Sequence, residues 1–106
     1  LILPPPLEGS AQVAARVLAA REIQARRYAA IGLPHVVSNA AAPSSVIETV
    51  AELDSSGASL LRDAADRMRL TARGFHRVLK LARTLADLDG AGKVSRAHLA
   101  EALSYR

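Results

Sequence analysis

Residues 70–88 read LTARGFHRVLKLARTLADL, and this stretch decides how the rest of the chain is interpreted. At 100° per residue, its apolar side chains fall on one face of a helix and its basic side chains on the other. The apolar face holds Phe75, Val78, Leu79, Ala82, Leu85 and Ala86, and the polar face holds Arg73, His76, Arg77, Lys80, Arg83, Thr84 and Asp87. The pattern predicts an amphipathic helix that packs on a core along one side.

The start of this helix carries a cation where helix electrostatics disfavour one. Thr71 is the predicted N-cap, which puts Arg73 in the first turn, beside the small Gly74. Unpaired N–H groups and the macrodipole already make this end positive, so a cation there costs a few tenths to about 1 kcal/mol. An anion suits such an end better. We therefore expect Arg73 to meet a phosphate supplied from elsewhere.

Composition allows a single domain with a modest core in 106 residues. Hydrophobic residues make up 50% of the chain, but much of this is alanine and only three residues are aromatic, so an aliphatic, helical core is expected. The net charge of +4 is weak evidence for an anionic partner. No cysteine is present, which excludes disulfides and thiolate metal sites. Neither a membrane span nor a signal peptide is predicted, and we expect a cytoplasmic protein.

Local signals divide the chain into an extended start and a series of helices. Prolines at positions 4–6 keep residues 1–9 extended. Helices are predicted at residues 10–30, 46–52, 55–69, 71–88 and 96–104, from capping residues followed by apolar periodicity. The predicted caps are Ser10, Ser45, Asp54 or Ser55, Thr71 and Ser95. The predicted fold class is all-α, a small bundle of four to five helices.

The periodicity also predicts which side chains form the core. On the first helix the inner stripe is Val13, Val17, Ala20, Tyr28 and Ile31, with Gln24 intruding and Arg27 pointing away. On the third it is Leu60, Leu61, Ala64, Ala65 and Met68. The three aromatic residues, Tyr28, Phe75 and Tyr105, are expected in the core or at its edge.

Catalytic and metal-binding patterns are absent from the sequence. His35, His76 and His98 fall in different predicted elements and lack the spacing of metal ligands. No Ser-His-Asp or Cys-His set stands out, and no glycine-rich phosphate loop occurs. We expect no metal site, and we do not expect this chain alone to be an enzyme.

The stretch at residues 70–88 resembles the C-terminal domain of magnesium-chelatase-like AAA+ ATPases, in the competence-associated ComM-like branch. The family pattern is close to L-S-A-R-G-Y-H-R-[IV]-L-K-[VL]-A-R-T-[IL]-A-D-L. The departures are Thr71 for serine, which still caps, and Phe75 for tyrosine, which loses the hydroxyl. The ending HLAEALSYR, residues 98–106, is similar to the family's H-[IL]-x-E-A-[IL]-x-Y-R. Weaker similarity upstream involves Arg16, Gln24, Arg27 and the loop Ser38-Asn39-Ala40.

The resemblance implies that residues 10–106 form the lid of an AAA+ ATPase, with residues 1–9 leading in from a preceding core. ATP and Mg²⁺ would be bound mainly by that core, and Arg73 would be the sensor-2 arginine that reaches the β- and γ-phosphates. The lid would contact its own core and neighbouring subunits of a hexamer. The parent ATPase would act in DNA remodelling or helicase-like work. Whether Arg73 acts on its own subunit's ATP or a neighbour's is left open.

Two alternatives remain for the basic face beyond Arg73. Arg77 lies one turn further on, so a role with phosphate or a neighbouring subunit weighs about evenly against simple solvation. For Lys80 and Arg83 a solvated face is favoured. The face formed by Arg73, Arg77 and Lys80 also fits an independent module that binds nucleic acid or an acidic protein partner, although aromatic residues for stacking are few. His76 is expected to form surface hydrogen bonds, and Asn39 to hold its loop by bonding backbone.

Overall fold

The structure is a computed structural model that describes residues 9–105. Within that range it contains five α-helices and one 3₁₀ turn: α1 (Ser10–Ala30), η1 (Asn39–Ala41), α2 (Ser44–Val50), α3 (Ser55–Arg67), α4 (Ala72–Leu88) and α5 (Arg96–Ser104). The only pairing of extended backbone in this range is an isolated parallel bridge between Leu53 and Val94. The prediction of an all-α domain is confirmed. The predicted extended start lies outside the described residues, except for Gly9.

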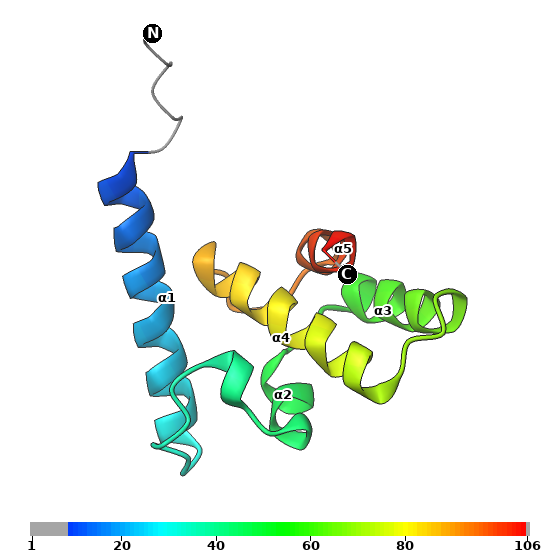
Figure 1. Ribbon diagram of the computed structural model, residues 1–106, viewed down its shortest axis with the longest axis horizontal. Helices are drawn as coiled ribbons and strands as arrows, with labels where there is room; N and C mark the ends of the chain where they lie inside the picture. The colour runs from blue at the N-terminus through cyan, green and yellow to red at the C-terminus, as the bar shows by residue number, and fades with distance from the viewer. Residues whose placement is uncertain (1–8, 106) are drawn as a thin grey trace, which may run out of the picture.

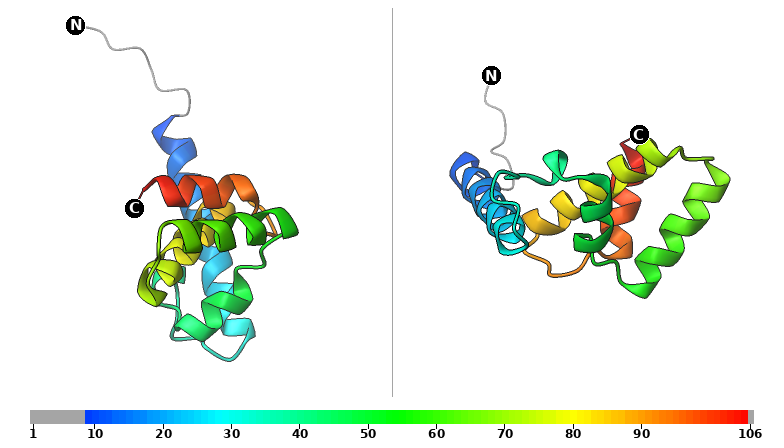
Figure 2. Two further views of the ribbon diagram at one scale, coloured as in Figure 1. Left: turned by 90° about the vertical axis from the view of Figure 1, so that its right-hand side faces the viewer. Right: turned by 90° about the horizontal axis from the view of Figure 1, so that it is seen from below.

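Helix α4 is the support on which most other elements rest. Its main contacts are with α1, η1, α2 and α5, while α3 packs on α5. Helix α1 stands beside one end of α4, and α3 lies at the opposite side of the molecule (Figure 1; Figure 2, right). The two ends of α4 therefore have different neighbours.

Side-chain caps begin three of the helices as the sequence predicts. Thr71 Oγ1 accepts a hydrogen bond from the Gly74 N–H at 3.0 Å, and Asp54 Oδ1 accepts one from the Gly57 N–H at 2.6 Å. Ser95 Oγ accepts from the backbone N–H of His98 at the start of α5. These bonds span only three residues, which is why local sequence reveals them.

Two predicted caps are wrong. Helix α1 starts at Ser10 itself, with Gly9 as its N-cap, and Gln12 accepts a hydrogen bond from the Gly9 N–H at 3.0 Å. Helix α2 starts at Ser44 after Pro43, without the predicted capping box between Ser45 and Glu48. The Glu48 carboxylate lies instead 2.8 Å from the ring of His76 on α4. A tertiary contact has replaced the local one.

The core is aliphatic, but its edges differ from the predicted stripes. The fully or nearly fully buried apolar residues include Tyr28, Val36, Ile47, Leu61, Val78, Leu79, Ala82, Ala86, Val94 and Leu99. Helix α1 buries only Ala20, Gln24 and Tyr28. The predictions for Val13 and Ile31 are wrong, since both are exposed at the two ends of α1, where the helix extends past α4 (Figure 1). Met68 and Tyr105 are also exposed.

Among residues 9–105, no helix combines the length and apolar character needed to cross a membrane.

Candidate functional site

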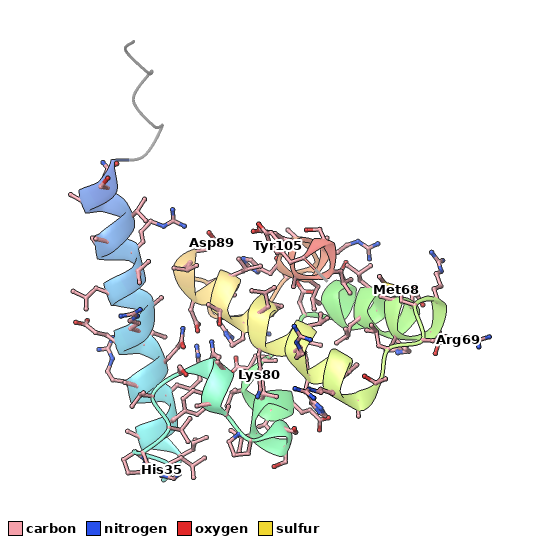
Figure 3. All side chains as sticks on the ribbon, viewed as in Figure 1. His35, Met68, Arg69, Lys80, Asp89 and Tyr105 are labelled. Atoms are coloured by element: carbon pink, nitrogen blue, oxygen red, sulfur yellow. The ribbon has the colours of Figure 1, made fainter. Side chains whose placement is uncertain are left out.

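An open hollow of about 1160 Å³ runs along the outer face of α4. Four basic residues line it, Arg69, Arg73, Arg77 and Lys80, together with Met68 and Tyr105. We call this hollow the α4 channel. Its lining also includes residues of η1 and the start of α2, residues 68–71 and the end of α5. Figure 3 shows Arg69, just after α3, well apart from Lys80 on α4. The structure thus brings Arg73, Arg77 and Lys80 together in one surface feature.

Arg73 occupies the second position of α4, directly after the cap Thr71 and Ala72. Its side chain is exposed, and no residue in the described range forms an ion pair or hydrogen bond with it. Thr71 caps only one of the first N–H groups, that of Gly74, so the other first-turn donors still face outwards. Arg73 is a cation with nothing in residues 9–105 to neutralise it, at a helix end that suits an anion.

Two further polar residues of the channel are tied to neighbouring elements. Lys80 Nζ donates a 3.1 Å hydrogen bond to the carbonyl oxygen of Ala40 in η1. His76 Nε2 lies 2.8 Å from Glu48 Oε1 on α2. The prediction that His76 forms surface hydrogen bonds is confirmed. Lys80 was predicted to be simply solvated, but it forms a hydrogen bond to η1. An ammonium group has three donors, so Lys80 keeps capacity for an anion.

The channel offers no ligand set for a metal ion. Its lining, as far as the structure describes it, includes neither Asp nor Glu. Across residues 9–105, no three side chains of His, Cys, Asp or Glu come together in a group that could hold a metal. The charged side chains in the described lining are cations, so the channel suits an anion and not a metal ion.

The opposite end of α4 holds a buried polar network centred on Asp87. Arg27 on α1 pairs with both carboxylate oxygens, with its Nη1 2.8 Å from Oδ2 and its Nη2 2.5 Å from Oδ1. Arg83 Nε donates to Oδ1 at 3.2 Å, and Asn39 Nδ2 donates to Oδ2 at 2.9 Å. The Asp87 side chain is 1% exposed. One carboxylate therefore joins α1, η1 and two turns of α4.

Asn39 completes this network from the loop side. Its Oδ1 accepts hydrogen bonds from the Tyr28 hydroxyl at 2.6 Å and from Arg27 Nη1 at 3.1 Å. Its backbone N–H donates to Gln24 Oε1 at 2.9 Å. The prediction that Asn39 bonds backbone is wrong, because the hydrogen bonds of its side chain go to the side chains of Arg27, Tyr28, Thr84 and Asp87.

Arg83 is the other buried cation of α4, with 1% of its surface exposed. Besides Asp87, its guanidinium donates to four backbone carbonyl oxygens at 2.8–3.4 Å, those of Val50, Ala51, Ala91 and Gly92. The first two belong to the C-terminal end of α2, where the helix dipole is negative. Arg83 thus joins the end of α2 to the loop between α4 and α5.

The pKa values in this network reflect two competing effects. Burial alone would raise the pKa of Asp87, but hydrogen bonds from Arg27 and Asn39 and the charges of Arg83 and Arg27 lower it. The bond to Asp87 raises the pKa of Arg27, and burial lowers that of Arg83. Burial also raises the pKa of Tyr28. Asp87 is therefore held as a carboxylate between two charged arginines.

The prediction of a solvated Arg83 is wrong, since this residue is buried, and the burial of Arg27 and Asp87 beside it was not predicted. The periodicity places Arg83 and Asp87 on the polar side of α4 correctly. That side is covered near its C-terminal end by η1 and the segments that follow α2 and α4, whose carbonyl and amide groups satisfy the charges. Helical periodicity predicts which way a side chain points from the helix. It does not predict which other segments of the chain cover that side.

A family model described as magnesium chelatase, subunit ChlI C-terminal, matches residues 7–106. The chain belongs to this family. Among its relatives, competence protein ComM of Haemophilus influenzae is 42% identical over 99 residues, covering 93% of this chain and 18% of the relative. The uncharacterized protein YifB of Escherichia coli is 40% identical over 101 residues, covering 95% and 19%. The resemblance to a ComM-like magnesium-chelatase C-terminal domain is confirmed.

The mycobacterial relative Mb2921c of Mycobacterium bovis, also uncharacterized, is 39% identical over 100 residues, covering 93% of this chain and 19% of its own length. The chain therefore spans less than a fifth of the length of each of these relatives. What the whole proteins do is a separate question from what this ComM-like domain contains.

Two features of the sequence point to the buried network of the ComM-like domain. Arg83 and Asp87 stand four residues apart, the spacing of an ion pair on one helix face. Gln24, Arg27 and Asn39, which carry the weaker family similarity upstream, are the residues that meet near Asp87. These three residues therefore take part in holding the fold together.

Proposed function

We propose that this ComM-like domain is the lid of an AAA+ ATPase and that Arg73 is its sensor-2-type arginine. One observation carries the proposal: Arg73 is exposed at the N-terminal end of α4 and has no partner among residues 9–105. A guanidinium can hold two phosphate oxygens at once and stays charged at any physiological pH. Placed at the β- and γ-phosphates, it would stabilise charge that develops on the transferring phosphoryl group.

Mg²⁺ and most contacts to ATP belong, in this proposal, to an AAA+ core outside this chain. The α4 channel supplies cations and, in its described lining, no carboxylate, so it suits the phosphates and not the metal ion. When bound, Mg²⁺ would neutralise phosphate charge from the side of the core. Arg77 and Lys80 would extend the positive lining towards the nucleotide or towards a neighbouring subunit.

The parent protein is proposed to be a cytoplasmic hexameric ATPase that remodels DNA. Support comes from membership of the magnesium chelatase family and from similarity to a protein named for competence. The lid would contact its own core and the next subunit. Arg73 would act on ATP in either position, within its own subunit or across the interface.

The direct test is Arg73→Ala in the full-length parent. We expect ATP hydrolysis to fall about 100-fold or more, the scale seen when a group that stabilises transition-state charge is removed. Circular dichroism and thermal unfolding should remain unchanged, because Arg73 has no partner in the described fold. Arg62→Ala is the matched control, since Arg62 is an exposed arginine on α3 outside the channel. Near-normal turnover by a folded Arg73→Ala protein would contradict the proposed role.

A second measurement uses the 106-residue chain alone. We expect isothermal titration with MgATP to show binding weaker than micromolar, because a single lid arginine would supply only part of the nucleotide site. Micromolar affinity would place the main ATP site in this chain and would refute the division between core and lid.

A further inference from the structure

Helix α5 begins with a capping box in which a histidine stands where glutamate or glutamine is usual. The Ser95 side chain accepts a hydrogen bond from the His98 N–H, and His98 Nδ1 accepts one from the Ser95 N–H at 3.1 Å. A glutamine oxygen in that position stays an acceptor across the physiological pH range. An imidazole nitrogen stops being an acceptor when it is protonated. The histidine therefore makes this cap depend on pH.

The hydrogen bonds around the His98 ring define its protonation state. A backbone N–H only donates, so Nδ1, which accepts from Ser95, carries no proton. The proton of the neutral ring is then on Nε2, which lies 2.7 Å from Oδ2 of Asp89, the C-cap residue of α4. The Ser95 hydroxyl lies 3.0 Å from Nδ1 and is able either to donate to it or to accept from it. His98, 9% exposed, is thus held as the neutral Nε2–H tautomer between the ends of two helices.

Charged groups on the neighbouring elements act mainly on the Nε2 side of the ring. The Asp89 carboxylate would attract a protonated His98 there. Arg16 on α1, with its Nη2 4.0 Å from Asp89 Oδ1, shares the same carboxylate. On α3 the Asp54 carboxylate caps its own helix. The other charged side chains of α5 and of the loop before it are exposed, namely Lys93, Arg96 and Glu101. Asp89 would therefore keep a protonated ring in place at Nε2, and protonation would change the Nδ1 side.

The start of α5 also positions α3, which lies beside it (Figure 2). Val94, directly before the cap, bonds the chain that leads into α3 through its N–H and its carbonyl oxygen, both at 3.1 Å. Leu99, directly after His98, is fully buried. A Cβ added to Gly57 on α3 would lie only 3.0 Å from Leu99 Cδ1, so the two helices approach closely at this turn. A change at the cap would therefore reach α3.

We infer that His98 acts as a pH-sensitive cap, which closes the start of α5 when neutral and opens it when protonated. Protonation adds an N–H at Nδ1, and the Ser95 N–H then loses its acceptor. The Ser95 hydroxyl, 3.0 Å away, is the group that accepts from the new N–H. The contact with Asp89 persists as an ion pair, so the ring stays on α4 while the first turn of α5 and its contact with α3 loosen. This switch goes beyond the proposed lid role, because it involves no bound nucleotide and no residue of the α4 channel that contacts phosphate.

NMR of the ¹⁵N-labelled 106-residue chain, titrated from about pH 8 to about pH 5, tests the inference over the range in which histidines change charge. At the upper end, the ring nitrogen shifts of His98 should be those of the Nε2–H tautomer. As the ring is protonated, hydrogen exchange of the Ser95 amide should become about tenfold faster, after correction for the pH dependence of intrinsic exchange. That is the size expected for the loss of one hydrogen bond.

Two variants separate the cap from general effects of acid. His98→Gln keeps the acceptor of a capping box and does not titrate, so the Ser95 amide should stay protected throughout the range. Because glutamine is a usual residue in this position, the variant is also expected to fold. His35→Gln is the matched control, since His35 is an exposed histidine in the loop after α1. It should leave the pH dependence of the Ser95 amide as in the wild type.

The inference is overturned if the corrected exchange rate of the Ser95 amide is the same with His98 neutral and protonated, or if His98→Gln keeps the wild-type pH dependence. An Nδ1–H tautomer at the upper end of the titration would also overturn it, since Nδ1 would then not accept from Ser95. So would a ring that takes up no proton in this range. None of these outcomes bears on Arg73 and ATP hydrolysis, which is measured separately in the full-length parent.

Discussion

The two ends of α4 carry the same residue type in opposite environments. Near the N-terminal end, Arg73 and Arg77 are exposed in the α4 channel, whereas near the C-terminal end Arg83 is 1% exposed and fully hydrogen-bonded. One local difference distinguishes them. Four residues after Arg83 stands the carboxylate of Asp87, and four residues after Arg73 stands another arginine. Within α4, the arginine with an acidic residue four positions on is buried in the network, and the two without one are exposed.

The largest expected effect comes from Asp87→Asn. The substitution leaves Arg27 and Arg83 without their shared counter-charge in a buried site, which costs about 3–5 kcal/mol of unfolding free energy. Urea denaturation monitored by circular dichroism measures this loss. Asp66→Asn, on the exposed surface of α3, should change stability by less than about 0.5 kcal/mol. Equal stability of the two variants would mean that the network does not hold the fold.

A direct comparison of the two ends is Arg83→Met against Arg77→Met. The first removes the donor for carbonyl oxygens at the end of α2 and in the loop after α4, at a cost of about 2–4 kcal/mol. The second alters an exposed residue, and we expect a change below about 0.5 kcal/mol. Denaturant midpoints of the two proteins give the comparison. Similar losses of stability in the two variants would mean that Arg83 is no more important for the fold than the exposed Arg77.

Asp87 should also make the fold sensitive to acid. Its pKa is lower in the folded protein than its ordinary value of 3.8. Its contribution to stability is therefore complete at neutral pH, begins to decline as the pH approaches that value, and is lost as the pH falls through the lower folded-state pKa. An NMR titration of the Asp87 carboxyl carbon should give a midpoint below 3.8 that moves upward in Arg27→Gln. A midpoint at or above the ordinary value would show that burial outweighs the two arginines.

The smallest expected effect is a gain in stability at the exposed end. Arg69 follows the C-cap of α3 in a left-handed conformation, and the Leu70 N–H bonds the Ala65 carbonyl oxygen at 3.1 Å, as in a Schellman motif. Glycine is the residue that this position favours, so Arg69→Gly should stabilise the fold by roughly 0.5–1 kcal/mol. Thermal unfolding checks the sign. A loss of stability would indicate that the Arg69 side chain contributes packing that offsets its backbone strain.

Much of the architecture could be predicted because its causes are local. Thr71, Asp54 and Ser95 cap helices through bonds to residues three positions away, and the apolar stripe of α4 faces the core as predicted. The α4 channel was partly predictable too, since Arg73, Arg77 and Lys80 share one helix face. The prediction that Tyr105 lies in the core or at its edge is wrong, because its exposure depends on how the end of α5 packs.

The buried network could not be predicted from local patterns. Arg27 and Asp87 are 60 residues apart, and Asn39 and Asp87 are 48 apart, so no helical period connects them. The exposure of Val13 and Ile31 has a similar origin, since only the position of α1 against α4 decides which part of its apolar stripe is covered.

The sequence by itself determined the fold class, most helix limits, the family and the row of cations on α4, because capping and periodicity act within a few residues. Only the tertiary structure decided which arginines remain available. Arg83 is enclosed because η1, the end of α2 and the loop after α4 bring oxygen atoms to it, and Arg73 stays exposed because none of the described elements does. The physical reason is that a buried charge is tolerated only where distant segments supply its partners.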